Sequence, residues 1–181
     1  EHIAAHEPEA TLFVVLAGAY LHDVIDDKLV PNPEIAIEAL CSYLKEIGVS
    51  EERMQQIIHV ITNVSYSKEA RYGKNELTLE AKIVQDADRL DALGAIGILR
   101  TAYYGGAVGH EIHNPLIPPQ SYGTKGQFQR GSTVINHFYE KLLHIQQGLH
   151  TDYAKKEGHL RHLFMEHFLD EFYREWQEER E

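Results

Sequence analysis

Apolar residues recur at helical spacing along most of this chain, and this periodicity limits the fold more than any other feature. The clearest case is the segment 51–63, whose apolar residues fall at positions i, i+3, i+4 and i+7, namely Met54, Ile57, Ile58 and Ile61. Such spacing places the apolar side chains on one face of a helix. No segment alternates apolar and polar residues over a length that would predict a strand. The pattern therefore predicts an all-α fold.

Capping and breaking residues set the ends of the expected helices. Asn32, Ser50 and Thr78 suit the N-cap position, because their side-chain oxygens can accept hydrogen bonds from the N–H groups of a first turn. Glycine commonly ends a helix, as Gly48 and Gly105 are placed to do. We expect six helices, over about 8–25, 34–47, 51–63, 79–104, 132–149 and 152–176.

Two longer segments lack this periodicity. Residues 64–77 are polar and basic, and residues 105–130 are rich in Gly, Pro, Gln and Asn. A loop as long as the second is usually functional in a compact domain. We therefore expect 105–130 to be an active-site loop.

The length and the charge of the chain exclude some classes of protein. A chain of 181 residues fits one domain with a substantial core. The net charge of -11 argues against a nucleic-acid partner, which would require a basic surface. No stretch approaches the roughly 20 apolar residues of a membrane span. The single cysteine, Cys41, fits a reducing compartment, so we expect a cytoplasmic protein.

The first candidate site is the stretch 20–27, YLHDVIDD. His22 and Asp23 are adjacent, and Asp26 and Asp27 follow within a turn or so of helix. Acidic groups at the end of an apolar helix are costly to bury unless a cation compensates them. Imidazole and carboxylate donors suit a divalent metal. The alternative is an ordinary helix end with solvated acids.

A second acidic cluster lies in residues 83–94, IVQDADRLDALG. Asp86, Asp88 and Asp91 surround one apolar helical face, with Asp91 toward the apolar stripe and Asp88 on its rim. Three carboxylates in this arrangement favour a site over a plain surface. The alternative is that they cap a helix or pair with Arg89.

These segments resemble the HD-domain metal-dependent phosphohydrolases, through HDVIDD followed by QDADRLDALGAIGILR. The more similar subgroup consists of small stand-alone bacterial hydrolases, which also show segments like NVSYSK at 63–68 and NHFYEKLL at 136–143. The four segments match in order between Phe13 and Trp176. The resemblance implies an HD-domain helical bundle of about six or more helices, built as a single domain over 1–181.

The resemblance also implies a ligand set. The family binds one metal through an upstream histidine, a His-Asp doublet and a distant aspartate. By this resemblance the metal ligands are His22, Asp23 and Asp88, with Asp91 as the second candidate for the distant aspartate. We expect the upstream histidine to lie before residue 1, so that the HD domain is incomplete at its N-terminus. Mn or Mg is the expected metal, with Fe, Co, Ni and Zn as alternatives.

Roles for the remaining residues follow. A cation at such a site polarises a phosphoryl oxygen and makes water more acidic. Asp26 or Asp27 can orient that water or accept its proton. The candidates for substrate binding come from the matching segments and their neighbourhood, and are Lys68, Lys141, Ser65, Ser67, Arg89 and His137. The alternative for each lysine is an ordinary solvated side chain.

The subgroup implies hydrolysis of a nucleoside triphosphate to a monophosphate and pyrophosphate. An alarmone or cyclic-nucleotide hydrolase is the alternative within the same class. A non-catalytic, nucleotide-binding regulatory protein is the alternative of another class. In each case the partner is a small phosphorylated molecule, with no nucleic acid and no membrane, and the sequence is compatible with a homodimer.

Overall fold

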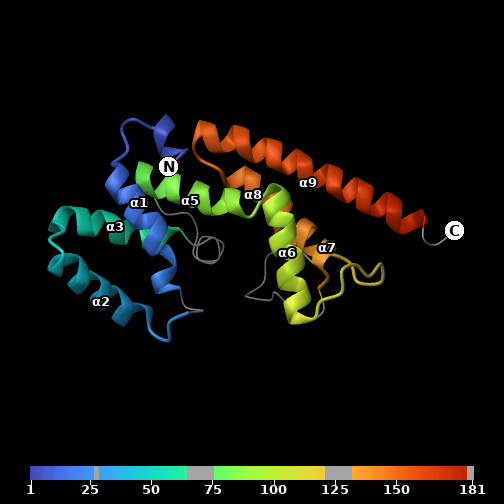
Figure 1. Cartoon of the computed structure of the whole chain (residues 1–181), viewed down its shortest axis with the longest axis horizontal. Helices are drawn as coiled ribbons and strands as arrows, with labels where there is room; N and C mark the ends of the chain where they lie inside the picture. Colours follow the sequence, from blue (N-terminus) through green and yellow to red (C-terminus); the bar gives the residue numbers. More distant parts are fainter. Residues whose placement is uncertain (27–28, 65–75, 121–131, 179–181) are drawn as a thin grey trace. The chain divides into compact units, whose positions relative to one another are not determined.

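The structure is a computed structural model that describes residues 1–26, 29–64, 76–120 and 132–178 of the 181-residue chain (Figure 1). Every regular element in these ranges is a helix, which confirms the prediction of an all-α fold. The chain divides into two compact units, Glu1–Asp88 (unit 1) and Arg89–Glu181 (unit 2), and each is described by itself. A single domain over 1–181 stays a prediction.

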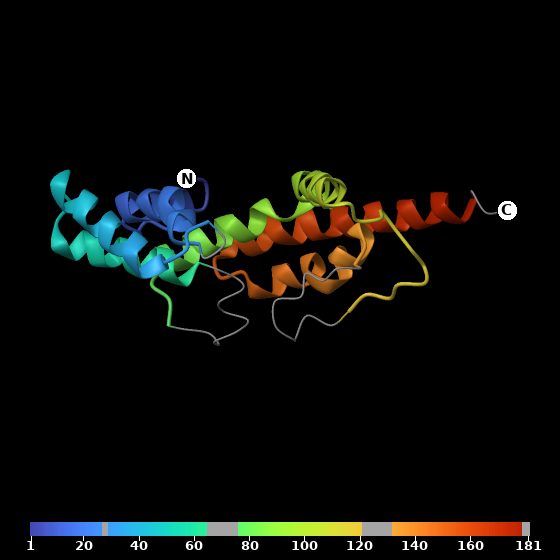
Figure 2. The same ribbon diagram turned by 90° about the horizontal axis from the view of Figure 1, so that it is seen from below.

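Unit 1 is a group of helices in which α1 and α2 both pack on α3 (Figure 1 and Figure 2). Its elements in order are a 3-10 turn at Ala4–His6, α1 at Leu12–Leu21, a 3-10 turn at His22–Ile25, α2 at Pro33–Glu46, α3 at Glu51–Asn63 and α5 at Leu79–Asp91. Only the last turn of α5, from Arg89 onward, belongs to unit 2.

A glycine allows α1 to approach its neighbours closely. A Cβ atom at Gly18 would lie 2.5 Å from Cγ1 of Val60 on α3 and 3.5 Å from Cγ2 of Val84 on α5. Val60 and Val84 are both buried, and so is Val14, which lies one turn before Gly18 on α1. The helix that leads to His22 is therefore fixed against α3 and α5 by backbone-to-side-chain packing.

The predicted N-caps are confirmed. Asn32 accepts hydrogen bonds from the N–H groups of Glu34 and Ile35, and Ser50 accepts one from Arg53. Thr78 accepts one from the N–H of Ala81. The first helix is shorter than predicted. The extended backbone of Thr11 delays its start to Leu12, and a 3-10 turn replaces its last residues.

The prediction of one helix over 79–104 is wrong. The chain turns at Ala92 and Leu93, and a new helix, α6, runs over Gly94–Val108. Gly94 has φ of +72°, a left-handed conformation that suits glycine and interrupts an α-helix. Nη1 of Arg161 donates a hydrogen bond of 2.7 Å to the Leu90 carbonyl, which satisfies one acceptor at the end of α5.

Unit 2 contains α6 and the segments after it, and α6 packs on α9. The later elements are α7 at Val134–His137, a π-helical turn at Phe138–Leu142, α8 at Leu143–Ile145, a 3-10 turn at Gln146–Gly148 and α9 at Asp152–Glu178. The predicted helix over 132–149 thus holds in outline, but it contains a π-helical turn. Phe138 in that turn is buried and stacks on Phe168 of α9.

The predicted loop over 105–130 begins later than expected. Helix α6 continues through Gly105 to Val108 and ends at Gly109, whose φ of +78° forms a left-handed C-cap. His113 beyond it packs edge-on against aromatic rings of α9, and Ile117 accepts a hydrogen bond from the Asn136 side chain. Residues 121–131 lie outside the described part, so the active-site role of this loop stays a prediction.

Candidate functional site

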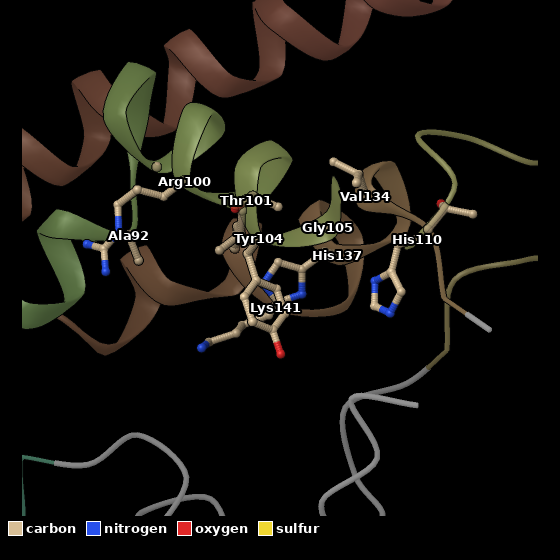
Figure 3. Close-up of a pocket in the computed structure, with 12 residues that line it drawn as sticks. Ala92, Arg100, Thr101, Tyr104, Gly105, His110, Val134, His137 and Lys141 are labelled. Carbon is tan, nitrogen blue, oxygen red and sulfur yellow. The ribbon is translucent and has the colours of Figure 1, made fainter. Parts of the chain in front are cut away.

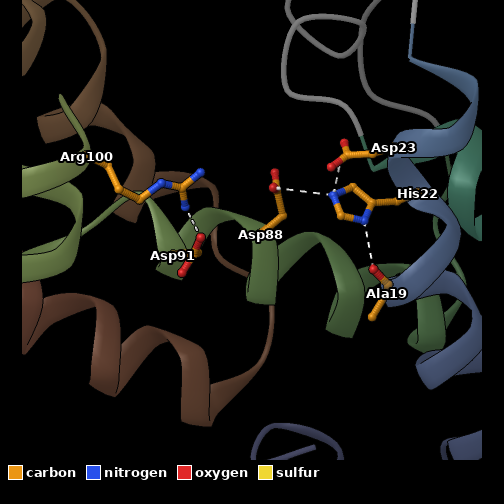
Figure 4. Close-up of polar contacts among 6 residues, drawn as sticks. All are labelled: Ala19, His22, Asp23, Asp88, Asp91 and Arg100. Atoms are coloured by element: carbon orange, nitrogen blue, oxygen red, sulfur yellow. Dashed lines mark hydrogen bonds and ion pairs between the residues drawn. The ribbon is translucent and has the colours of Figure 1, made fainter. Parts of the chain in front are cut away.

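His22 begins the 3-10 turn after α1, and its ring is held by the preceding helix. Nδ1 of His22 lies 2.8 Å from the carbonyl oxygen of Ala19 (Figure 4). Because a carbonyl oxygen only accepts hydrogen bonds, Nδ1 carries a proton and donates it to this bond. In the neutral ring Nε2 then presents a lone pair. Metal-binding histidines commonly have their second nitrogen fixed in this way.

Two carboxylates converge on that nitrogen. Oδ1 of Asp23 lies 3.3 Å from Nε2 of His22, and Oδ1 of Asp88 lies 3.8 Å from it. Asp23 comes from the same 3-10 turn and Asp88 from α5, and both side chains point at the ring (Figure 4). The structure thus brings together, within unit 1, the three residues that the sequence predicts as metal ligands.

The donor types of this cluster fit a divalent cation. Two carboxylates beside a ring lone pair repel one another electrostatically unless a proton or a cation lies among them. The side chains of His22, Asp23 and Asp88 are 25%, 66% and 43% exposed, so an ion can reach them from solvent. One imidazole nitrogen and carboxylate oxygens are donors that Mn, Mg, Fe and Zn accept.

The distances between the donor atoms fit a bound ion less well than the donor types do. Donor atoms about 2.1 Å from one ion lie about 3 to 3.5 Å from each other. The distance from His22 to Asp23 falls in this range, whereas Asp88 lies slightly farther out. Within the described ranges, no three or more histidine, cysteine or acidic side chains are already gathered closely enough to hold an ion. Asp88 would therefore have to move a few tenths of an ångström toward His22.

The other predicted acidic residues have separate positions. Asp26 follows the 3-10 turn, and its N–H donates to the Asp23 carbonyl at 3.1 Å. Asp86 is fully buried. Asp91, the second candidate for the distant ligand, forms an ion pair with Arg100 in unit 2 (Figure 4). Asp27 lies outside the described residues. The water-handling role of Asp26 and Asp27 stays a prediction.

Two of the predicted substrate-binding residues line one pocket of unit 2. His137 and Lys141 contribute to a cavity of about 240 Å³ (Figure 3). Arg100 and Tyr104 of α6 line it as well, together with His110 just beyond that helix. The pocket is therefore formed by α6 with the residues that flank it and by the α7–π-turn segment.

His137 is neutral at physiological pH. Burial, which is the largest cause, and the nearby charges of Lys141 and His110 together lower its pKa to about 4. A neutral imidazole offers one N–H donor and one nitrogen acceptor to a ligand.

Comparison with known proteins settles the family. The model of the HD domain family matches residues 1–93, more than half of the 181-residue chain. The chain belongs to the HD domain family. The matched range contains all three residues of the His22 cluster, so the doublet and Asp88 lie in the part of the chain that is typical of HD domains.

Relatives of this HD-domain protein match it over most of its length. A solved structure from Lactobacillus plantarum is 42% identical, with a TM-score of 0.81, over 97% of this chain and 81% of that one. A Bacillus thuringiensis structure, described as an HD-superfamily hydrolase, is 38% identical, with a TM-score of 0.76, over 96% and 78% of the two chains.

A third relative is YpgQ of Bacillus subtilis. It is 35% identical over 161 residues, which are 89% of this chain and 71% of YpgQ. The crystal structure of YpgQ in complex with ADP superposes with a TM-score of 0.72, over 95% of this chain and 78% of that one. The family match and the hydrolase relative confirm the expectation that this HD-domain protein is a metal-dependent hydrolase.

One predicted substrate-binding residue of the HD-domain protein is placed in the interior. Arg89 is only 3% exposed, and its Nη1 donates a hydrogen bond to the Gly148 carbonyl and lies 3.3 Å from Nε2 of His150. A guanidinium used in this way ties the last turn of α5 to the 3-10 turn before α9, both within unit 2. The burial argues against contact with a ligand that arrives from solvent.

The remaining predicted binding residues cannot be placed. Lys68, Ser65 and Ser67 lie outside the described residues. Arg100, Tyr104 and His110 were not among the residues predicted from the sequence, although Arg100 and Tyr104 are separated by one helical turn and share a face of α6. This pair of polar side chains, on a helix otherwise rich in small and apolar residues, could have indicated a binding surface.

Proposed function

We propose that this HD-domain protein is a phosphohydrolase that converts nucleoside triphosphates to monophosphates and pyrophosphate, with Mn or Mg as its metal. The observation that carries the proposal is the convergence of Asp23 and Asp88 on the Nε2 atom of His22. The nucleotide class is supported by YpgQ, a relative whose structure was solved with ADP. We also propose that it acts in the cytoplasm of a bacterium.

His22, Asp23 and Asp88 would hold the cation. A bound divalent cation polarises the phosphoryl oxygen and lowers the pKa of water. The hydrogen bond from Nδ1 of His22 to Ala19 keeps the ring oriented and keeps Nε2 available as a donor atom. Because Ala19 belongs to α1, the packing of that helix determines where the histidine lies.

Proton transfer falls to Asp26 and Asp27 in this proposal. Water attacks the α-phosphorus, the bond from that phosphorus to the bridging oxygen breaks, and pyrophosphate leaves. The proton lost by the water passes to an aspartate carboxylate acting as general base. Asp26 lies next to the metal-site turn along the chain and is only partly exposed, which suits a group that must meet water.

The test is a nucleotide panel with the full chain. The protein is incubated with each nucleoside triphosphate in Mn or Mg, and the products are identified by chromatography and phosphorus NMR. Monophosphate and pyrophosphate in equal amounts are expected. Guanosine tetraphosphate and cyclic dinucleotides in the same panel test the alternative hydrolases. Release of no phosphorylated product from any triphosphate refutes the proposal.

Variants connect the activity to the site. His22→Ala and Asp88→Ala should each reduce turnover by about 100-fold or more, because each removes a metal donor. His167→Ala is the matched control, since His167 is exposed on α9. Circular dichroism establishes that each variant is folded. Equal turnover in His22→Ala and His167→Ala would remove the metal site from the mechanism.

A further inference from the structure

The pocket lined by His137 and Lys141 has the charge pattern of an anion site. Arg100 on α6 and Lys141 on the π-helical turn both line it, and the twelve described residues around it include no carboxylate. This concentration of positive charge occurs in a protein whose net charge is -11. A cationic pocket on an acidic protein attracts a small polyanion selectively.

Hydroxyl groups add neutral donors to these cations. Thr101 and Tyr104 of α6 and Thr133 before α7 also line the pocket. Arg100 is paired with Asp91, but both side chains are 62% exposed. An exposed ion pair contributes little stability, so a ligand can compete for the guanidinium. Phosphate oxygens accept several hydrogen bonds at once, and arginine binds them in bidentate geometry.

The lowered pKa of His137 supports a positive local potential. Burial is the main cause of its low pKa of about 4, and the charges of Lys141 and His110 also lower this pKa. The field of cations that disfavours a proton on His137 favours an anion in the same space. Figure 3 shows the side chains of Tyr104, His137 and Lys141 together, with His110 beside them, and all four line the pocket.

The size of the pocket limits the ligand. A cavity of 240 Å³ corresponds to about eight water molecules at their liquid volume. This is below the roughly 300–1,000 Å³ of pockets for drug-sized molecules. Two linked phosphate groups are of a size that matches this volume.

The lysine comes from an irregular part of the helix. Lys141 lies in the π-helical turn Phe138–Leu142, whose first and last residues are buried. π-helical turns inside α-helices occur frequently at functional sites, because they change the direction of side chains relative to the rest of the helix. Thr133 caps α7 by accepting a hydrogen bond from the Asn136 N–H, which fixes the start of this segment.

We propose that this pocket of unit 2 binds a condensed phosphate, with Lys141 and Arg100 as its charged contacts and Tyr104 and His137 as neutral donors. Pyrophosphate is the smallest ligand of this class. The choice of pyrophosphate over other condensed phosphates rests on the proposed function, in which pyrophosphate is the leaving product.

Calorimetric titration of the full chain with inorganic pyrophosphate in EDTA tests the pocket without a metal. Lys141→Met and Arg100→Gln should each bind pyrophosphate about tenfold or more weakly than the parent protein, because each loses a charge-assisted hydrogen bond. Lys155→Met is the matched control, since Lys155 is exposed on α9 and does not line the pocket. Its affinity should equal that of the parent protein.

Each outcome decides the inference. Absence of pyrophosphate binding at millimolar concentration, or equal affinities in Lys141→Met, Arg100→Gln and Lys155→Met, overturns it. If Lys141→Met does not fold, Arg100→Gln supplies the comparison. Pyrophosphate binding should survive His22→Ala, which removes a metal donor of unit 1. Pyrophosphate binding without nucleotide hydrolysis refutes the proposed function but supports the pyrophosphate site. Nucleotide hydrolysis with no effect of Lys141→Met or Arg100→Gln on pyrophosphate binding supports the proposed function but overturns the pyrophosphate site.

Discussion

Gly18 links the packing of unit 1 to the geometry of the proposed metal site. It belongs to α1 and lies one turn before His22, and it faces Val84, which lies one turn before Asp88 on α5. The contact between Gly18 and Val84 is therefore one turn from the pair formed by His22 and Asp88. A side chain at residue 18 would collide with Val60 on α3, so it should displace α1 and change the position of His22 relative to Asp88.

The magnitude follows from the spacing. A methyl group at residue 18 would lie 2.5 Å from Cγ1 of Val60, well inside van der Waals contact, and Val60 is fully buried. Overpacking of this kind costs about 1–3 kcal/mol. Alanine in place of glycine within a helix otherwise gains about 0.5–1 kcal/mol. Gly18→Ala should therefore lower the free energy of unfolding by about 1–2 kcal/mol and weaken Mn affinity by about tenfold.

Two controls isolate the contact. Gly106→Ala introduces the same change in α6, where no atom lies within 4 Å of the new Cβ, and should leave stability equal or slightly higher. Val60→Ala removes the methyl groups that collide with residue 18. In the double variant with Gly18→Ala, the loss of stability should be smaller than the sum of the single losses.

Urea unfolding and Mn titration by calorimetry give both quantities. Unfolding of Gly18→Ala and Gly106→Ala at the same urea concentration would show that residue 18 is not closely packed. A destabilised Gly18→Ala that binds Mn as tightly as the parent protein would show that the packing of α1 does not control the metal site.

Three further predictions concern unit 2. The folded-state pKa of His137 is about 4, below the ordinary value of 6.5. Between pH 6.5 and pH 4 the unfolded chain therefore binds a proton that the folded chain does not bind at His137. The free energy of unfolding should fall by up to about 3 kcal/mol as the pH drops through this window. Urea unfolding of His137→Gln should lack that part of the pH dependence. Arg89→Met should lower the free energy of unfolding by about 1–3 kcal/mol, because it leaves the Gly148 carbonyl without this donor. Arg174→Met, which removes an exposed ion pair, should lower it by less than about 0.5 kcal/mol. Similar losses in the two variants would contradict the structural role of Arg89. Gly94→Ala should cost about 1–2 kcal/mol in thermal unfolding because φ is +72° there, and an unchanged melting temperature would contradict this.

The local features of the fold were predictable because their causes are local. Asn32 and Ser50 cap helices through the N–H groups of the next few residues, and these bonds can be inferred from the sequence alone. The helical periodicity of residues 51–63 likewise reports a buried face of α3 directly. The approach of Asp88 to His22 was expected only through the family resemblance, because spacing along the chain does not show which distant residues meet.

The failures arise where a distant partner or a single backbone angle decides the outcome. Gly94 lies within an apolar pattern that continues unbroken, and only its left-handed φ reveals the end of α5. Arg89 looked like a residue available to a phosphate, but its partner, the Gly148 carbonyl, lies far along the chain. The phosphate pocket was missed in part because Arg100 and Tyr104 belong to a helix that the sequence placed within a longer one.

The early end of α5 also affects how strongly unit 1 can attract a cation. Helix α1 ends at Leu21 and α5 at Asp91, so His22 and Asp88 each lie within a turn of the carboxyl end of a helix. Carbonyl groups in a last turn carry partial negative charge, and a cation nearby gains about 0.3–1 kcal/mol per helix end. A substitution that allowed α5 to continue past Gly94 would move one of these ends away. Metal affinity at the proposed site should then fall although every proposed ligand remained in place, because the backbone at the helix end contributes to the attraction of the ion.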